Sequence, residues 1–116
     1  ARADLRQSEE ALRETELQTE TLVDRAETGY AEATARVEAL RETVRLMEEV
    51  ARVEQLSLSE GVGIQRDLLD AESDLLRARA GLIRAEGSAV LARISLARAR
   101  GTLTMDWIES HVEDAR

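Results

Sequence analysis

The chain has 116 residues and a formal net charge of −8, and it contains one histidine and no cysteine. This length allows one small domain, and the lack of cysteine excludes a disulfide framework, a thiolate metal site and a cysteine nucleophile. An acidic chain without a basic patch argues against nucleic acid and anionic membrane surfaces as partners. No apolar run has the length of a membrane span. A sequence that begins at Ala1 without methionine is expected to be a piece of a longer protein.

Helix-forming residues dominate the composition, chiefly alanine, leucine, glutamate and arginine, whereas the chain has one Trp, one Tyr and no Phe. A compact globular core would usually draw on more aromatic volume. The composition is typical of long helices packed side by side. We therefore predict an all-α fold, a long antiparallel two-helix coiled-coil hairpin.

Residues 1–60 are predicted to form the first long helix, which is most polar over its first 22 or so residues. One heptad column consists of Val23, Tyr30, Val37, Val44, Ala51 and Leu58, and its companion of Ala26, Ala33, Leu40 and Met47. Alternating steps of three and four are typical of a coiled-coil seam. A second apolar strip, Leu46, Val50, Val53 and Leu56, occurs only toward residue 60.

Residues 61–63 are predicted to be the turn between the helices, at the tip of the hairpin. Gly61 suits the left-handed conformation that ends a helix, and Gly63 then releases the chain into the second helix. Asp67 and Asp70 fall in the first two turns of that helix, where carboxylates are favoured. A plain interhelical turn would explain the two glycines but not the paired aspartates.

The second long helix is predicted over residues 64–112, with an acidic tail at 113–116. Its predicted packing seam consists of Leu68, Ala71, Leu75, Ala78, Leu82 and Ala85, and a further apolar column of Leu69, Leu76, Ile83, Val90 and Ala97. Together these columns cover an arc wider than a two-helix contact buries, which indicates further helices alongside. Gly101 is expected to kink or end the helix, and Trp107 is expected to pack rather than to bind a ligand.

No constellation of catalytic residues can be assembled, so we expect neither an enzyme nor a cofactor. His111 lies near Glu109 and Glu113, but one such ligand pair on a terminal helical turn is weak evidence for a metal, and we predict none. The polar face of the second helix carries Asp67, Asp70, Asp74, Arg77, Gly81, Arg84 and Ser88. In a monomer this face would simply be solvated, whereas copies arranged around an axis would turn it into rings of charge.

A family resemblance rests on Gly61, Asp67, Leu69, Asp70 and Ala71, then Ala78, Ala85 and Gly101-Thr102-Leu103. This run resembles the second helical hairpin of the TolC family of outer-membrane efflux proteins, in which a tip of the type Gly-x5-Asp-x-Leu-Asp-Ala leads into a long helix. The resemblance covers nearly the whole chain.

The resemblance implies a fragment of a periplasmic α-barrel in a trimeric outer-membrane channel of the Gram-negative cell envelope. Such a channel is a passive exit duct, joined to an inner-membrane pump through a periplasmic adaptor, and it meets the membrane only through β-strands that this chain lacks. Carried over by position, Gly61, Val62, Gly63 and Ile64 would contact the adaptor, and Asp67 and Asp70 would form acidic rings at the periplasmic mouth. The family often has an aromatic residue at the position of Leu58, and some members have a latching Arg at that of Gly63; Arg66 is the candidate replacement.

Two alternatives keep the helical architecture. The hairpin of the adaptor itself has an Arg-x3-Leu-x6-Ser pattern, of which Arg52 and Leu56 match the first two positions while Gly63 occupies the third. A generic structural coiled coil is the other alternative, against which the paired tip glycines and the alanine column count.

Overall fold

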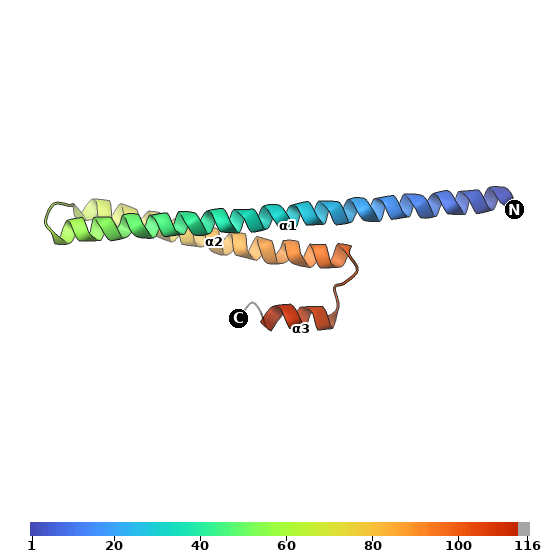
Figure 1. Cartoon of the computed structure of the whole chain (residues 1–116). Coiled ribbons are helices and arrows are strands. Elements are labelled where there is room, and N and C mark those ends of the chain that lie inside the picture. Colours follow the sequence, from blue (N-terminus) through green and yellow to red (C-terminus); the bar gives the residue numbers. More distant parts are fainter. Residues whose placement is uncertain (114–116) are drawn as a thin grey trace. The chain divides into compact units, whose positions relative to one another are not determined.

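The computed structural model of the chain describes residues 1–113, which form three α-helices and no strand. In Figure 1 these are α1 (Arg2–Ser59), α2 (Gln65–Ala99) and α3 (Met105–Glu113). The predicted all-α hairpin is confirmed. Of the predicted tail at 113–116, Glu113 is the last residue of α3, and the rest lies outside the described residues.

The chain divides into two compact units. The tip unit, Glu32–Val90, holds the second half of α1, the turn and most of α2. The end unit combines Ala1–Ala31 with the chain from Leu91 onward, including α3.

Within the tip unit, α1 and α2 run antiparallel side by side (Figure 1). The buried side chains are small or β-branched apart from one leucine: Val37, Val44, Leu68, Ala71 and Ala85. Alanines let two helix backbones approach closely, whereas each such contact removes little apolar area from water. The shared core is therefore a narrow seam, and most of each helix surface stays outside it.

Two ion pairs join α1 and α2 within the tip unit. Arg79 Nη2 lies 3.0 Å from Glu48 Oε1, and Arg41 Nη2 lies 3.5 Å from Glu86 Oε1. All four side chains are about half exposed, so water screens the attraction and each pair contributes little to stability. Their placement at two points along the helix pair favours one register of the two helices over another.

Within the range 64–112 predicted for the second helix, the structure has two helices, and the kink or end expected at Gly101 is an end. α2 begins at Gln65 and ends at Ala99, and α3 is a separate helix. The break has a local cause, because Gly101 adopts φ 73°, a left-handed conformation incompatible with continuing the helix. Thr104 then caps the new helix, with its Oγ1 accepting a hydrogen bond from the Trp107 backbone N–H at 3.2 Å.

The end unit is more sparsely packed along α1 than along α2. Every residue from Ala1 to Leu22 is exposed, including Leu5, Leu12, Leu17 and Leu22. By contrast, Leu96 and Ala97 near the end of α2 are buried. Arg100 Nη2, directly after α2, forms an ion pair with Glu27 Oε1 of α1 at 2.6 Å. No described helix combines the length and apolarity needed to cross a membrane.

Candidate functional site: the hairpin tip

The turn that joins α1 to α2 is built from backbone hydrogen bonds. The Gly61 N–H donates to the Leu58 carbonyl at 3.1 Å, while the N–H groups of Val62 and Gly63 both donate to the Ser57 carbonyl, at 3.1 and 3.0 Å. Gly61 adopts φ 78°, which a residue with a Cβ adopts at a cost. These bonds use carbonyl groups that a helix end would otherwise leave without partners. The predicted turn at 61–63 therefore spans residues 60–64 in the structure.

Gly63 is required by close packing rather than by its backbone angles. A Cβ at this position would lie 2.9 Å from both the Leu58 backbone nitrogen and the Ser57 Cβ. Separations below about 3 Å force neighbouring atoms to move, and here one of those atoms belongs to the backbone. A side chain at position 63 would therefore require this turn to rearrange.

The side chains of Val62 and Ile64 lie in solvent on either side of Gly63. Val62 is 79% exposed and Ile64 57% exposed, whereas the turn itself is held by backbone atoms alone. Exposed aliphatic side chains on a rigid turn bury readily against a partner, because little conformational freedom remains to be lost. The tip thus presents two exposed aliphatic side chains on a turn that backbone hydrogen bonds hold together.

Asp67 and Asp70 follow the tip on the exposed side of α2. Asp67 lies in the first turn of α2, where the free amide groups favour a carboxylate. Asp70 Oδ2 lies 4.0 Å from Arg66 Nε, a loose contact between two strongly exposed side chains. Arg66 therefore lies beside one of the aspartates of its own helix and leaves both carboxylates in water.

The predicted packing seam of α2 lies on its less exposed side. Leu68, Ala71 and Ala85 are buried, and Leu75, Ala78 and Leu82 are partly buried. The neighbouring column is different: Leu69, Leu76, Ile83 and Val90 are all exposed. On α1 the strip Leu46, Val50, Val53 and Leu56 is exposed as well. Within the tip unit, each helix therefore buries one apolar stripe and leaves a second one in water.

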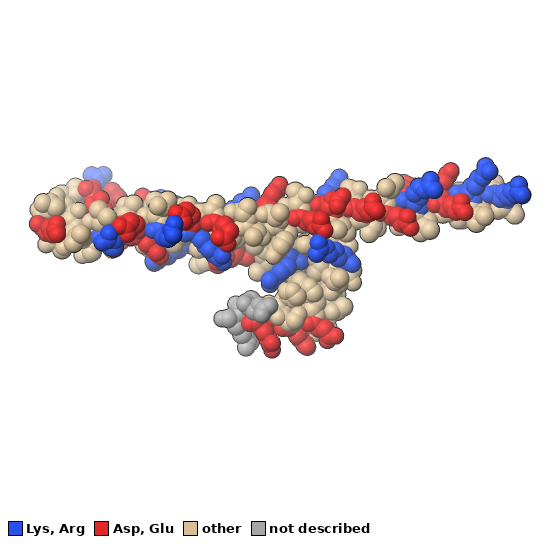
Figure 2. All heavy atoms as spheres, viewed as in Figure 1, with Lys and Arg blue, Asp and Glu red and all other residues tan. Residues whose placement is uncertain are grey.

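Charges are distributed over both helices rather than gathered into one patch. Figure 2 shows acidic and basic side chains interspersed along α1. Several belong to ion pairs within a single helix, such as Arg52 with Glu49 at 2.6 Å and Arg77 with Asp74 at 2.8 Å. Between these charges, uncharged surface remains at the tip (Figure 2).

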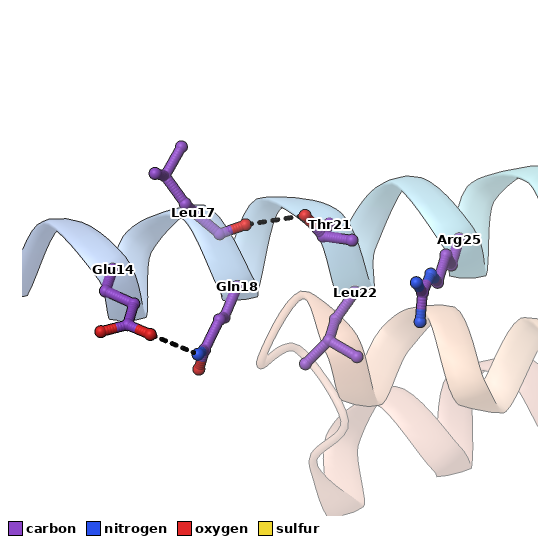
Figure 3. Close-up of a pocket in the computed structure, with 6 residues that line it drawn as sticks. All are labelled: Glu14, Leu17, Gln18, Thr21, Leu22 and Arg25. Carbon is purple, nitrogen blue, oxygen red and sulfur yellow. Dashed lines mark hydrogen bonds between the residues drawn. The ribbon is translucent and has the colours of Figure 1, made fainter.

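A shallow hollow on α1 carries no site. It is lined by Glu14, Leu17, Gln18, Thr21, Leu22 and Arg25, all from one helix. In Figure 3, Leu17 and Leu22 point to different sides of α1. The two dashed bonds join Thr21 Oγ1 to the Leu17 carbonyl and Gln18 to Glu14, so they hold residues of the same helix. Nothing converges there on a ligand.

His111 lies in α3 with its ring stacked on that of Trp107, at a centroid distance of 4.0 Å. Its Nδ1 lies 2.8 Å from the Trp107 carbonyl oxygen and 2.9 Å from Ser110 Oγ. Glu109 and Glu113 do not join it in a metal site, since no described residues form a cluster of three or more metal-ligating side chains.

Comparison with known proteins identifies the family. Residues 1–102 match the family model of the outer membrane efflux protein. The chain belongs to this family. Comparison with curated proteins and with solved structures gives no significant match. The resemblance to TolC-family proteins is thereby confirmed. Outer membrane efflux proteins are transport channels rather than enzymes, and they have a periplasmic helical part. The chain is accordingly a component of an outer-membrane efflux channel.

One group of residues was missed by the sequence analysis. Arg93 and Arg100, in α2 and directly after it, line a small cleft together with Tyr30 of α1 and Trp107 and His111 of α3. These residues come together because α2 ends before α3 begins, at the interruption expected from Gly101. The signal that was not used is Thr104, a helix cap three residues after Gly101.

Proposed function

We propose that this chain is a periplasmic helical hairpin of a trimeric outer-membrane efflux channel, and that its tip docks onto the helical tip of a periplasmic adaptor. The adaptor in turn connects the channel to an inner-membrane pump. The observation that carries the proposal is the exposed pair Val62 and Ile64 on a turn held by backbone hydrogen bonds, in a chain of this family.

The exposed apolar flanks support assembly with further helices. Residues such as Leu76 and Ile83 remain in water at heptad spacing although the hairpin seam is already filled. Burial of an aliphatic side chain contributes roughly 1.5 to 3 kcal/mol, so a flank of several favours neighbouring helices. In a closed wall of helices from three protomers, both flanks would be covered.

Tip docking can be tested in the chain itself, because it contains no cysteine. With Ser59→Cys as the only thiol, crosslinking to a cysteine in an adaptor hairpin tip reports proximity. Val62→Asp should reduce the crosslinking yield about tenfold, because a carboxylate would replace the apolar contact at the centre of the interface. The matched control is Leu17→Asp, a similarly exposed aliphatic residue in the end unit. Equal yields from both variants would refute docking through the tip.

Asp67 and Asp70 are proposed to form acidic rings at the periplasmic mouth of the assembled channel. In the full-length trimer, Asp67→Asn combined with Asp70→Asn should lower cation selectivity and weaken block by multivalent cations, because three copies of each charge disappear. Asp106→Asn in α3 is the control, because it also removes an aspartate charge but lies outside the tip unit. Single-channel recordings that show the same selectivity for all forms would exclude the rings.

A further inference from the structure

The end unit contains a cleft of about 190 Å³ that has an unusual balance of charge. Its lining consists of Tyr30 from α1, Arg93, Leu96, Ala97 and Arg100 from α2 and its end, and Thr102, Trp107 and His111 from the segment beyond. The lining includes two guanidinium groups and no carboxylate. In an acidic chain, this is a local excess of positive charge in a concave site.

Arg93 is the residue that sets this cleft apart. Its Nε is buried, and no described residue accepts a hydrogen bond from it. Buried side-chain donors in folded proteins nearly always have an acceptor, so a missing one points to a group that the chain does not supply. Other arginines with a carboxylate in reach form ion pairs, for example Arg79 with Glu48 and Arg41 with Glu38.

Arg100 supplies a second set of donors. One of its nitrogen atoms, Nη2, bonds to Glu27 Oε1 at 2.6 Å, and a guanidinium has further N–H groups that this contact leaves unused. Glu27 holds the Arg100 side chain in place without itself lining the cleft. Arg93 and Arg100 lie seven residues apart, which places both on one side of the end of α2.

The rest of the lining combines aromatic, aliphatic and hydroxyl-bearing side chains. Trp107 and His111 are stacked with their rings 16° from parallel, and Leu96 and Ala97 are buried. The guanidinium groups of Arg93 and Arg100 are the permanently charged donors of the lining. The aromatic and aliphatic part of this lining suits a planar monoanion better than a strongly hydrated dianion such as phosphate.

We propose that this cleft binds a single carboxylate group, held by the guanidinium groups of Arg93 and Arg100. The planar fork of a guanidinium matches the two oxygens of a carboxylate. The volume is below the roughly 300 Å³ at which pockets for drug-sized ligands begin, so the group is a small free acid or the side chain of an Asp or Glu. Binding here does not depend on the proposed channel role, because every lining residue belongs to the end unit.

Trp107 gives a direct readout, since it is the only tryptophan of the chain and it lines the cleft. Its fluorescence is titrated with sodium acetate as a free acid and with N-acetylglutamate amide as a side-chain mimic, each against sodium chloride at matched ionic strength. We expect a saturable change with at least one carboxylate, and the tighter of the two probes identifies the source. Sodium phosphate should give a weaker change.

Three variants separate the cleft from general charge effects. Arg93→Gln should weaken carboxylate binding at least tenfold, and Arg100→Gln should weaken it as well. Arg98→Gln is the matched control, because Arg98 is exposed on the same helix and does not line the cleft. Circular dichroism checks that helix content is preserved, and Arg93→Lys, which keeps the charge but loses the fork, serves if Arg93→Gln does not fold.

The proposal fails if neither carboxylate gives a saturable change beyond that of chloride. It fails also if Arg93→Gln and Arg98→Gln bind alike, or if phosphate binds more tightly than either carboxylate.

Discussion

The end of α1 and the end of α2 use the same backbone hydrogen bonds in different surroundings. At each, a glycine N–H donates to the carbonyl three residues earlier, Gly61 to Leu58 and Gly101 to Arg98, both at 3.1 Å. The next N–H donates to the carbonyl five residues earlier in both cases. The glycine φ angles, 78° and 73°, are nearly equal.

The residue after the glycine differs between the two helix ends. After Gly61 comes the strongly exposed Val62, whereas the Thr102 hydroxyl after Gly101 donates to the Ala97 carbonyl at 3.2 Å. The glycine therefore decides where each helix ends. The residues after it decide whether the end becomes an exposed tip or part of a packed corner.

Of the substitutions considered, Gly63→Ala should lower the unfolding free energy most. The second helix end has no equivalent position where an added side chain would clash. The added Cβ would meet Leu58 and Ser57 at 2.9 Å, and overpacking of this kind costs typically about 1 to 3 kcal/mol of unfolding free energy. The corresponding position after Gly101 is Leu103, which shows that the second helix end accepts a large side chain there. Urea unfolding followed by circular dichroism measures the loss. An unchanged midpoint would mean that the turn rearranges at little cost.

Gly61→Ala and Gly101→Ala should each lower the unfolding free energy by about 1 to 2 kcal/mol. Both positions have open space where a Cβ would lie, so the cost comes from the left-handed backbone alone and should be similar at the two ends. Gly87→Ala is the control, because this mid-helix glycine also has open space and alanine should stabilise it by up to about 1 kcal/mol. If the two variants lost clearly different amounts of unfolding free energy, the packing around each glycine, rather than its backbone conformation, would set the cost of the substitution.

Removal of an ion pair between helices should lower the unfolding free energy least, in either unit. Glu27→Gln in the end unit and Glu48→Gln in the tip unit each remove one partner of a half-exposed pair, which contributes roughly 0.2 to 1 kcal/mol. Both losses should shrink at high salt, because mobile ions screen exposed charges. Unfolding at low and high salt tests this. A loss at Glu27 well above that at Glu48, unaffected by salt, would mean that Arg100 is more deeply involved in the end unit than its exposure indicates.

Sequence periodicity predicted the hairpin because a heptad pattern encodes which side of a helix is buried. Val37 and Val44 are buried, and Leu46 and Val50 are exposed, in keeping with their separate columns. Periodicity alone does not mark the end of α2, since Leu103 keeps the seven-residue spacing from Leu96 beyond the helix break, and the interruption was expected from Gly101 instead. Local backbone conformation at Gly101 outweighed the pattern.

The cleft in the end unit lay beyond sequence reasoning for a different reason. Tyr30 and Arg93 are distant in sequence and carry no shared motif, so only the packed structure places them together. The tip residues Gly61, Val62, Gly63 and Ile64, by contrast, are contiguous and were found from the glycine spacing. Their contact with an adaptor, like the acidic rings, stays a prediction.

The crowding at Gly63 restricts how the hairpin end can diversify. A side chain at position 63 would force its neighbours to shift, and position 61 is held by its φ angle, so substitution at either position costs stability. In the proposed docking role, a change of partner would therefore come most readily through positions 62 and 64. A library randomised at only those two codons would therefore sample most of the specificity available to this surface.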